Sequence, residues 1–430
     1  MLKKFNYPAD RKKILSQLSG RTSGFEQVMS VTENIVSDVK KNGDSALIRY
    51  TEKFDGPRLA PLELPVQKNE IGRALKSLSP SVKKALETAI KNIQAFHERD
   101  TASAFLYTGR HGETLGKMIT PVENAGIYIP GGSGGKTPLL STALMNIIPA
   151  RIAGCRRIFV CTPPAQDKSI NPALLAACSM AGADEIYRCG GAQAIAAMAY
   201  GTLIIKKADL IAGPGNRYVN CAKKIVFGDV MIDGLFGHSE IVIIADHYAN
   251  PVYIASDLLS QAEHAGQETA VLISTDDDII DRTLQELKKR IKDMPRRALI
   301  ESSFRHCGLA VKVPSIETAF DLSNQIAPEH LEICVQDAAG LLGFVKNAGA
   351  VFAGAYSSEP IGDYIAGTNH ILPTNGTARF SSPLGVKTFC KETNIIIYNQ
   401  KAFNAYKKDA ALLARLEGLH AHAGALAARK

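Results

Sequence analysis

The chain lacks an apolar run of the roughly 18–20 residues that a membrane-spanning helix requires. Its first residues, Met1 to Phe5, include two lysines and do not provide the apolar core of a secretory signal peptide. From these two absences we expect a cytoplasmic protein that does not associate with a membrane.

The sequence also lacks any C-x-x-C pair of cysteines, the usual signature of a zinc knuckle or a redox-active dithiol. Most cysteines instead lie within apolar runs. We therefore predict that they are reduced core residues, and that they form neither disulfides nor a thiol nucleophile. The eight cysteines are Cys155, Cys161, Cys178, Cys189, Cys221, Cys307, Cys334 and Cys390.

Positive charge is not concentrated in one segment. The 50 basic and 42 acidic residues give a net charge of +8, and basic doublets such as Lys12-Lys13 and Lys288-Lys289 are scattered along the chain. This distribution favours solvated helix faces over a nucleic-acid-binding groove, and it indicates only a mild attraction for anionic ligands. We expect no nucleic-acid partner.

Length and pattern together predict several domains. The 430 residues exceed the about 250–300 residues at which a single core stops growing. Residues 1–123 have mainly helical periodicity, whereas residues 124–237 alternate β-rich runs with helical segments, as parallel βαβ units do. Residues 238–380 repeat this alternation, with one of the helices expected over residues 338–345, and residues 381–430 form a tail. We predict an α/β fold with two α/β modules, a cleft between them, a helical N-terminal segment and a C-terminal tail domain.

Three glycine-rich turns follow predicted strands of the first module, at residues 130–135, 190–193 and 213–216. Open α/β sheets bind ligands at the carboxyl ends of their strands, so these turns predict a nucleotide pocket. Neither of the familiar glycine motifs is complete. Segment 130–137 has proline where a phosphate-binding P-loop begins with glycine, and Tyr218 replaces the third glycine of a dinucleotide fingerprint.

Glu329 and His330 are adjacent side chains of the two types that most often transfer protons near neutral pH. They follow Pro328, which ends a helix-like segment, and they precede the strand-like residues 331–335. Such a dipeptide taken alone is more often a surface pair than a catalytic one.

Three further segments carry side chains that can bind a metal ion. Gln261 and His264 have the spacing of residues that share one face of a helix, Asp363 lies in a long polar loop over residues 357–370, and His422 ends an H-x-H sequence. Each has an ordinary explanation: a hydrogen-bonded helix end, a capped turn, or chance in an alanine-rich terminus. Together they permit a metal-assisted site without identifying its reaction.

The combined motifs resemble those of the histidinol dehydrogenase family over nearly the full chain. No single motif is specific, but the combination is. The motifs are Y-I-P-G-G from Tyr128, G-G-A-Q-A-I-A-A around Gln193, G-P-G-N ending at Asn216, the stretch from Ile232-Asp233 through Ser239-Glu240 to Glu263-His264, A-P-E-H-L-E at 327–332, G-D-Y around Asp363, and G-L-x-A-H ending at His422.

The resemblance implies a zinc-containing, NAD-dependent alcohol dehydrogenase that oxidises L-histidinol to L-histidine through L-histidinal, the last step of histidine biosynthesis. Two NAD⁺ molecules accept the four electrons in turn. The resemblance also implies that both modules are incomplete Rossmann-like folds and that part of the N-terminal segment packs with the second module. The protein would be a homodimer with shared active sites, in which the tail of one subunit completes the site of the other.

The same resemblance assigns the site residues, with Glu329 and His330 as the acid–base pair. One Zn²⁺ per subunit would be bound by Gln261, His264, Asp363 and, from the other subunit, His422. The residues implied for the NAD site are Tyr128, Gln193 and Asn216. The residues implied for substrate binding are Ser239, Gln261, His264, His330, Asp363, Glu417 and His422.

The sequence departs from the family pattern in two places. Phe236 stands where a small residue is usual and His238 where proline is usual, and residues 134–136 are extra. These changes leave open a related zinc- and NAD-dependent dehydrogenase for another small polar alcohol, and we hypothesise that His238 changes substrate preference or competes for the metal. Two other classes also stay open, a phosphotransferase that uses residues 135–137 and a non-catalytic zinc-binding protein.

Overall fold

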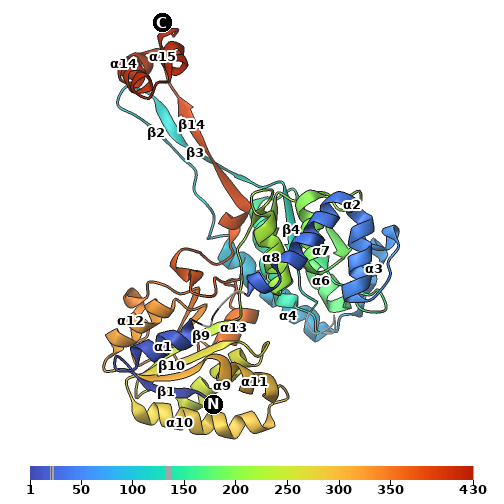
Figure 1. The fold of residues 1–430 in the computed structure, drawn as a ribbon, viewed down its shortest axis with the longest axis vertical. Helices are drawn as coiled ribbons and strands as arrows, with labels where there is room; N and C mark the ends of the chain where they lie inside the picture. Colours follow the sequence, from blue (N-terminus) through green and yellow to red (C-terminus); the bar gives the residue numbers. More distant parts are fainter. Residues whose placement is uncertain (20, 22–23, 132–136, 430) are drawn as a thin grey trace. The chain divides into compact units, whose positions relative to one another are not determined.

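The chain forms two compact units in the computed structural model. The first unit comprises Met1–Asp100 and Glu123–Phe389, and the second comprises Thr101–Val122 and Cys390–Lys430. Two parallel sheets with helices around them make up the first unit (Figure 1), so the predicted α/β fold is confirmed. The four-part division of the chain at residues 123, 237 and 380 stays a prediction. The residues that the structure describes are 1–19, 21, 24–131 and 137–429.

The first sheet is built from residues 124–232. Its elements are β4 (Asn124–Tyr128), α5 (Leu140–Ala153), β5 (Arg157–Thr162), α6 (Pro172–Ala181), β6 (Glu185–Arg188), α7 (Gly191–Tyr200), β7 (Leu210–Ala212), α8 (Arg217–Val226) and β8 (Met231–Ile232). All strands are parallel, in the order β6-β5-β4-β7-β8. The chain therefore runs outward from β4 to one side first and then from β7 to the other. At such a reversal the loops after neighbouring strands diverge and leave a crevice.

The second sheet has six parallel strands in the order β1-β11-β10-β9-β12-β13. The order in which the chain adds strands reverses between β9 and β12, because β10 and β11 lie on one side of β9 and β12 and β13 lie on the other. The elements are β1 (Lys3–Asn6), β9 (Glu240–Ala245), α9 (Pro251–Ala262), β10 (Thr269–Ser274), α10 (Asp277–Arg290), α11 (Arg297–Cys307), β11 (Gly308–Lys312), α12 (Ile316–Ile326), β12 (His330–Cys334), β13 (Ala350–Ala353) and α13 (Glu359–Tyr364). One edge strand, β1, comes from the far N-terminal part of the chain, where Lys3 pairs with Leu309.

Helices from the first hundred residues cover the first sheet. They are α2 (Met29–Asp55), α3 (Lys68–Ser77) and α4 (Pro80–His97), while α1 (Arg11–Leu18) lies near the second sheet. Figure 1 shows α2, in blue, beside the green helices α7 and α8, with which it packs. The α4 helix begins at Pro80, because Ser79 accepts a hydrogen bond from the Val82 N–H at 3.3 Å and Pro80 occupies the first helical position.

The second unit consists of a small antiparallel sheet and two helices. Its elements are β2 (Phe105–Thr108), β3 (Thr114–Pro121), β14 (Cys390–Ile397), α14 (Gln400–Leu416) and α15 (His420–Ala427), with the strands in the order β14-β3-β2. The H-x-H sequence lies in the first turn of α15, so it is not on a strand.

Two local expectations are wrong. Residues 338–345 form turns and a single 3₁₀ turn (Leu342–Phe344) instead of a helix, and this segment contains Gly340 and Gly343, which disfavour helix. The segment over 357–370 is not all loop, because it contains α13. Pro360 lies in the first turn of α13, where its missing N–H costs nothing.

The eight cysteines all lie in the described part of the chain and form no disulfide there, and six of them are buried, as predicted. Among the described helices, none is both long and apolar enough to span a bilayer.

A fully buried ion pair supports the crevice of the first sheet. The Lys223 ammonium contacts the Asp233 carboxylate and donates to the Gly213 carbonyl oxygen at 3.0 Å, while Asp233 accepts from the Gly213 N–H at 2.7 Å. Gly213 has φ of 120°, and a β-carbon there would lie 2.0 Å from the Tyr128 carbonyl oxygen. The pair therefore fixes a turn that only glycine can make, directly against the end of β4.

We expect Asp233→Asn to lower the free energy of unfolding by about 3–5 kcal/mol, because it leaves a buried ammonium without its partner. Urea unfolding measures the loss. The double variant Lys223→Met/Asp233→Leu should recover most of it, since it removes both charges. Arg282→Gln, which breaks an exposed pair with Asp278, is the control and should change stability by less than about 1 kcal/mol. A loss as small for Asp233→Asn would contradict the structural role of the pair.

Candidate active site

The Glu329–His330 pair lies beside β9 and β12, between which the strand order of the second sheet reverses. His330 is the first residue of β12 and pairs with Ile241 on β9. The pair therefore occupies the amino ends of the strands, although ligands of open α/β sheets usually bind at the carboxyl ends. Ala327, which ends α12, has φ of 52° and ψ of 62°, a left-handed conformation that is uncommon for a residue with a β-carbon. This bend turns the chain from α12 into the Glu329–His330 pair.

The backbone of Glu240 holds both members of the pair. Its N–H donates to Glu329 Oε2 at 2.9 Å, and its carbonyl oxygen lies 3.1 Å from His330 Nδ1. A carbonyl oxygen can only accept, so Nδ1 carries the imidazole proton and Nε2 keeps its lone pair. Nε2 is buried and has no hydrogen-bond partner among the described residues. The arrangement thus leaves one imidazole nitrogen available to take a proton.

The Glu240 side chain anchors this backbone. Arg21 Nη1 donates to both Glu240 carboxylate oxygens, at 3.1 and 3.2 Å, and the Asn375 N–H donates to Oε1 at 3.2 Å. Arg21 also donates to the carbonyl oxygens of Leu18 and Ile326, at 3.1 and 3.2 Å. A nearly buried ion pair therefore ties the start of β9 to the end of α12, immediately before the acid–base pair.

Burial disfavours the charged forms of Glu329 and His330 and shifts the pKa of each accordingly. It raises the pKa of Glu329 well above its usual value, an effect opposed by the Glu240 N–H and reinforced by the carboxylates of Glu240, Asp363 and Glu359. It lowers the pKa of His330 to about 3. The imidazole is therefore neutral at neutral pH, and Glu329 is a stronger base when ionised than an exposed carboxylate.

A cluster of potential metal ligands lies beside His330. One ring nitrogen of His330 and one carboxylate oxygen each from Glu359 and Asp363 lie within 4.8 Å of one another. Both acids are on α13, and Ser260 Oγ donates to Glu359 at 3.1 Å. Burial raises the pKa of Glu359 to about 8 and that of Asp363 to about 6. A bound cation would offset this unfavourable burial of negative charge.

Gln261 supports the same interpretation. It lies in the last turn of α9 and is fully buried, yet neither its Oε1 nor its Nε2 has a hydrogen-bond partner among the described residues. A buried amide without partners is costly, and a metal ion coordinated by the amide oxygen would relieve part of that cost. The carboxylate and amide oxygens of Glu359, Asp363 and Gln261 therefore fit a divalent cation.

His264 is placed differently from the expectation. The α9 helix ends at Ala262, so the helical spacing with Gln261 does not extend to His264, which is exposed. It remains close enough to lower the pKa of both Glu359 and His330 electrostatically. Ser239 directly precedes β9, and its carbonyl oxygen accepts from the Thr269 N–H at 3.1 Å.

His422 and Glu417 belong to the second compact unit. His422 lies in α15, and Glu417 directly follows α14. The geometry of the first unit therefore brings Glu329, His330 and Asp363 together but does not involve these two residues. Their part in the site stays a prediction.

Three residues of this site were not predicted from the sequence, Glu240, Glu359 and His370. His370 Nδ1 lies 3.2 Å from the Asp363 carbonyl oxygen, and its Nε2 lies 3.3 Å from Thr142 Oγ1 on α5. Glu359 lies four residues before Asp363, so in a helix the two carboxylates share one face. Predicting a helix here would therefore have indicated Glu359 as a neighbour of Asp363. No sequence signal marked Glu240, because its role depends on its backbone.

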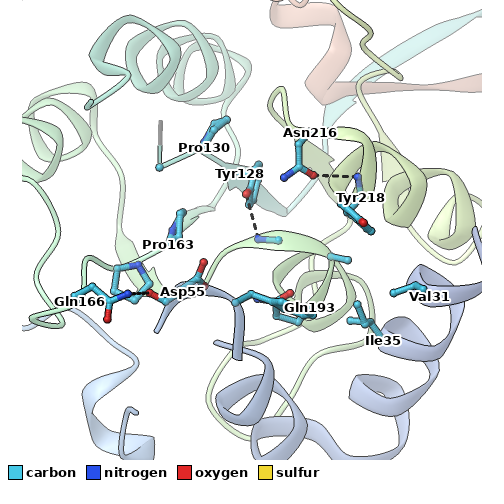
Figure 2. A pocket seen from close by; sticks show the side chains of 15 residues that line it. Val31, Ile35, Asp55, Tyr128, Pro130, Pro163, Gln166, Gln193, Asn216 and Tyr218 are labelled. Carbon is cyan, nitrogen blue, oxygen red and sulfur yellow. Dashed lines mark hydrogen bonds between the residues drawn. The ribbon is translucent and has the colours of Figure 1, made fainter. Parts of the chain in front are cut away.

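The first module contains a cavity of about 640 Å³ at the crevice between β4 and β7 (Figure 2). Its walls bring together the three residues expected at the NAD site, Tyr128, Gln193 and Asn216. The Tyr128 hydroxyl accepts from the Gly191 N–H at 3.1 Å, whereas neither amide atom of Gln193 has a partner among the described residues. The wall of the cavity therefore contains a buried amide whose hydrogen-bonding capacity is unused.

Asn216 and Tyr218 explain how this turn differs from a standard dinucleotide turn. Asn216 Oδ1 caps α8 by accepting from the N–H groups of Tyr218 and Val219, at 3.0 and 3.1 Å. The side chain of Tyr218 is partly exposed and lines the cavity, so it does not separate helix from strand. Only the amide nitrogen of Asn216 is left for a ligand.

Residues 132–136 lie outside the described residues. Both the expected P-loop alternative, which depends on residues 135–137, and the extra residues 134–136 fall wholly or mainly in this segment.

The two departures near Ser239 have separate surroundings. Phe236 donates its N–H to Asn220 Oδ1 at 2.9 Å, and its ring lies 4.8 Å from the Lys223 ammonium. His238 is half-buried and, with Arg21 and other residues, lines a polar cavity of about 110 Å³. The described cluster of His330, Glu359 and Asp363 does not include His238.

Comparison with known proteins gives the family. The family model described as histidinol dehydrogenase matches residues 19–430. The chain belongs to the histidinol dehydrogenase family. Histidinol dehydrogenases are oxidoreductases that generally use NAD and a metal, and the cluster around Asp363 is a possible metal site of this member.

Individual histidinol dehydrogenases agree with this result. The protein from Listeria monocytogenes is 47% identical over 95% of this chain and 94% of its own length, and that from Bacillus subtilis is 46% identical over the same shares. The crystal structure of histidinol dehydrogenase from Elizabethkingia anophelis matches with a TM-score of 0.92 at 36% identity, covering 100% of this chain and 98% of that one. These relatives do not favour the alternative of a dehydrogenase for another polar alcohol.

The buried acids predict a specific pH dependence of stability. The folded-state pKa of Glu359, about 8, exceeds its ordinary value of 4.5, so the folded state holds a proton that the unfolded state releases. Stability of the metal-free protein should therefore fall as pH rises from 4.5 to about 8. We expect Glu359→Gln to flatten this fall, measured as melting temperature against pH in the presence of a chelator.

The exposed Glu33 provides the control, and Glu33→Gln should keep the wild-type slope. Added Zn²⁺ should raise the melting temperature of the wild type more at pH 8 than at pH 5, because the cation favours the ionised carboxylates. Equal slopes for Glu359→Gln and the wild type would show that Glu359 is not protonated in the folded protein.

Proposed function

We propose that the protein oxidises L-histidinol to L-histidine through L-histidinal, the last step of histidine biosynthesis, with two NAD⁺ used in turn and one Zn²⁺ per subunit. The observation that carries the proposal is the buried Glu329–His330 pair, which the Glu240 backbone holds beside the Glu359–Asp363 cluster. The names of the relatives support the substrate.

In the first half-reaction His330 is the base. Its Nε2 takes the hydroxyl proton of the alcohol as a hydride leaves the adjacent carbon for NAD⁺, which gives the aldehyde and NADH. The bond from Nδ1–H to the Glu240 carbonyl oxygen stabilises the imidazolium that forms, since it points a fixed dipole at the new charge.

In the second half-reaction Glu329 is the base. It takes a proton from a water molecule whose oxygen bonds to the aldehyde carbon, and the resulting gem-diol loses a second hydride to another NAD⁺. One histidinol, one water and two NAD⁺ thus give one histidine carboxylate, two NADH and three protons. The raised pKa of Glu329 suits it for this step, because a more basic carboxylate removes a proton from water more readily.

Three residues of this chain, Gln261, His264 and Asp363, would hold the zinc ion, with the partner subunit's His422 as the fourth ligand. Bound zinc would supply a fixed positive charge that anchors the imidazole and amine of the substrate and prevents escape of the aldehyde. The unpartnered amide of Gln261 and the raised pKa of Asp363 support these assignments. Glu359 is a further candidate ligand, because it lies within the same cluster.

Tyr128, Gln193 and Asn216 would bind NAD in the cavity of the first module. Ser239 and Glu417 would bind the substrate together with the metal ligands and His330. The homodimer follows from the same proposal, since His422 and Glu417 would act in the site of the other subunit. We also retain a cytoplasmic location as part of the proposal.

The first test is the yield of NADH from L-histidinol. We expect two NADH per histidinol, lost on chelation and restored by Zn²⁺. A yield of one NADH per histidinol would show that the second half-reaction does not take place. NADH formed from other alcohols but not from histidinol would identify a related dehydrogenase instead, and His238→Pro would then show whether His238 sets the preference.

Mixing two inactive variants tests the shared site. Glu329→Gln and His422→Asn should each abolish activity, while refolding them together should restore about a quarter of it, because half of the dimers are then mixed and each has one intact site. Glu329→Gln mixed with His330→Asn is the control. These two changes affect the same part of one subunit, so no mixed dimer regains an intact site. Recovery in both mixtures, or in neither, would contradict the exchange of tails.

A further inference from the structure

Asp55 is an acidic residue in the wall of the cavity of the first module. It ends α2, and its backbone carbonyl accepts from Gln166 Nε2 at 3.2 Å. Its carboxylate accepts a hydrogen bond from the Gly190 N–H, but Oδ2 is buried and has no partner among the described residues. Figure 2 shows Asp55 between Gln166 and Gln193, on the opposite side of the cavity from Asn216. The Asp55 carboxylate thus lies in the wall of the cavity, with one buried oxygen that has no described partner.

The charge of Asp55 is not balanced locally. No lysine, arginine or histidine is among the described residues that line the cavity. Burial raises the pKa of Asp55 to about 6, so the carboxylate is still mainly ionised above neutral pH. An ionised carboxylate only accepts hydrogen bonds, so it repels a phosphate and attracts a group with paired donors.

We propose that Asp55 binds the two hydroxyl groups of the adenosine ribose of NAD and thereby excludes dinucleotides that carry a 2′-phosphate. The inference rests on the proposed function, in which this cavity binds NAD. The vicinal hydroxyls of a ribose offer two donors at a spacing that a carboxylate accepts, and acidic residues serve this purpose in other dinucleotide sites. A 2′-phosphate would replace one donor by negative charge beside Asp55, with no described cation to offset it.

The order of the sheet indicates which ribose Asp55 meets. Asp55 contacts the segments that follow β5 and β6, through Gln166 and Gly190, whereas Asn216 follows β7 on the other side of β4. From β7 and β8 the chain leads through residues 233–239 directly to Glu240 and the acid–base pair. The nicotinamide end therefore belongs on the Asn216 side, and the adenosine end belongs beside Asp55.

The test is calorimetric titration of the full-length dimer with NAD⁺, NADP⁺, 5′-AMP and nicotinamide mononucleotide. The variants are Asp55→Asn, which removes the charge, and Asp55→Glu, which retains it. Asp44→Asn is the matched control, because Asp44 is on the same helix, is partly buried and does not line the cavity. Circular dichroism checks that each variant is folded.

We expect Asp55→Asn to weaken NAD⁺ and 5′-AMP binding about 10-fold, the usual effect of losing a hydrogen bond to a charged group. NADP⁺ binding should not weaken, so the preference for NAD⁺ should fall by the same factor or more. Asp55→Glu should retain most of the preference, and Asp44→Asn all of it. An unchanged preference in Asp55→Asn, or a loss confined to nicotinamide mononucleotide, would overturn the inference. Should Asp55→Asn not fold, the wild type decides through its affinities for 5′-AMP and for 5′-AMP that carries a 2′-phosphate. Tighter binding of 5′-AMP would support the inference, and equal affinities would overturn it.

The NADH yield from histidinol separates this inference from the proposed function. A wild type that forms two NADH, together with an Asp55→Asn variant of unchanged cofactor preference, would leave the proposed function intact and reject the role of Asp55. A wild type that binds NAD⁺ through Asp55 but oxidises no histidinol would support the role of Asp55 and reject the proposed function.

Discussion

The backbone of Glu240 binds Glu329 through its N–H and His330 through its carbonyl oxygen, so neither side chain can move independently of β9. The Glu240 side chain is in turn fixed by Arg21, which also binds the end of α12. Hydrogen bonds set before the substrate arrives need no reorganisation during the reaction, which is the main advantage of a preorganised site. The same bonds select the imidazole tautomer, so the geometry of one strand end decides which nitrogen is reactive.

A cost accompanies this arrangement, because the site concentrates acids away from water. The carboxyl groups of Glu329, Glu332, Glu359 and Asp363 all have raised pKa values, in each case chiefly through burial. A metal ion at the Asp363 cluster would stabilise the ionised carboxylates, and this attraction would contribute to the free energy of metal binding. A metal ion bound there would also give the unpartnered Gln261 amide oxygen a partner.

Local features of the chain could be predicted from sequence, and features created by distant contacts could not. The alternation predicted over residues 238–380 is observed, for example in strand Glu240–Ala245 and helix Ile316–Ile326, because apolar runs end at clear turn signals there. Tyr128, Gln193 and Asn216 do meet in one cavity, because Tyr128 ends one strand of a parallel sheet and the other two follow neighbouring strands of that sheet. Glu240 was not predicted because its contacts with Glu329 and His330 are made by its backbone. The position of Asp55 at the cavity was not predicted because α2 reaches the cavity only through tertiary packing. The helix predicted over residues 338–345 was wrong because the prediction gave more weight to the apolar residues of this segment than to its two glycines.

The pairing of β1 with β11 has a consequence for synthesis of the protein. The sheet that carries Glu329 and His330 needs Lys3–Asn6 as its edge, but the partner strand Gly308–Lys312 leaves the ribosome about 300 residues later. At roughly 5–20 residues per second, β1 waits on the order of tens of seconds without a partner. The first sheet, which is contiguous in sequence, can form during that delay. Until β1 docks, β11 is an unprotected sheet edge, and such edges pair readily with other chains.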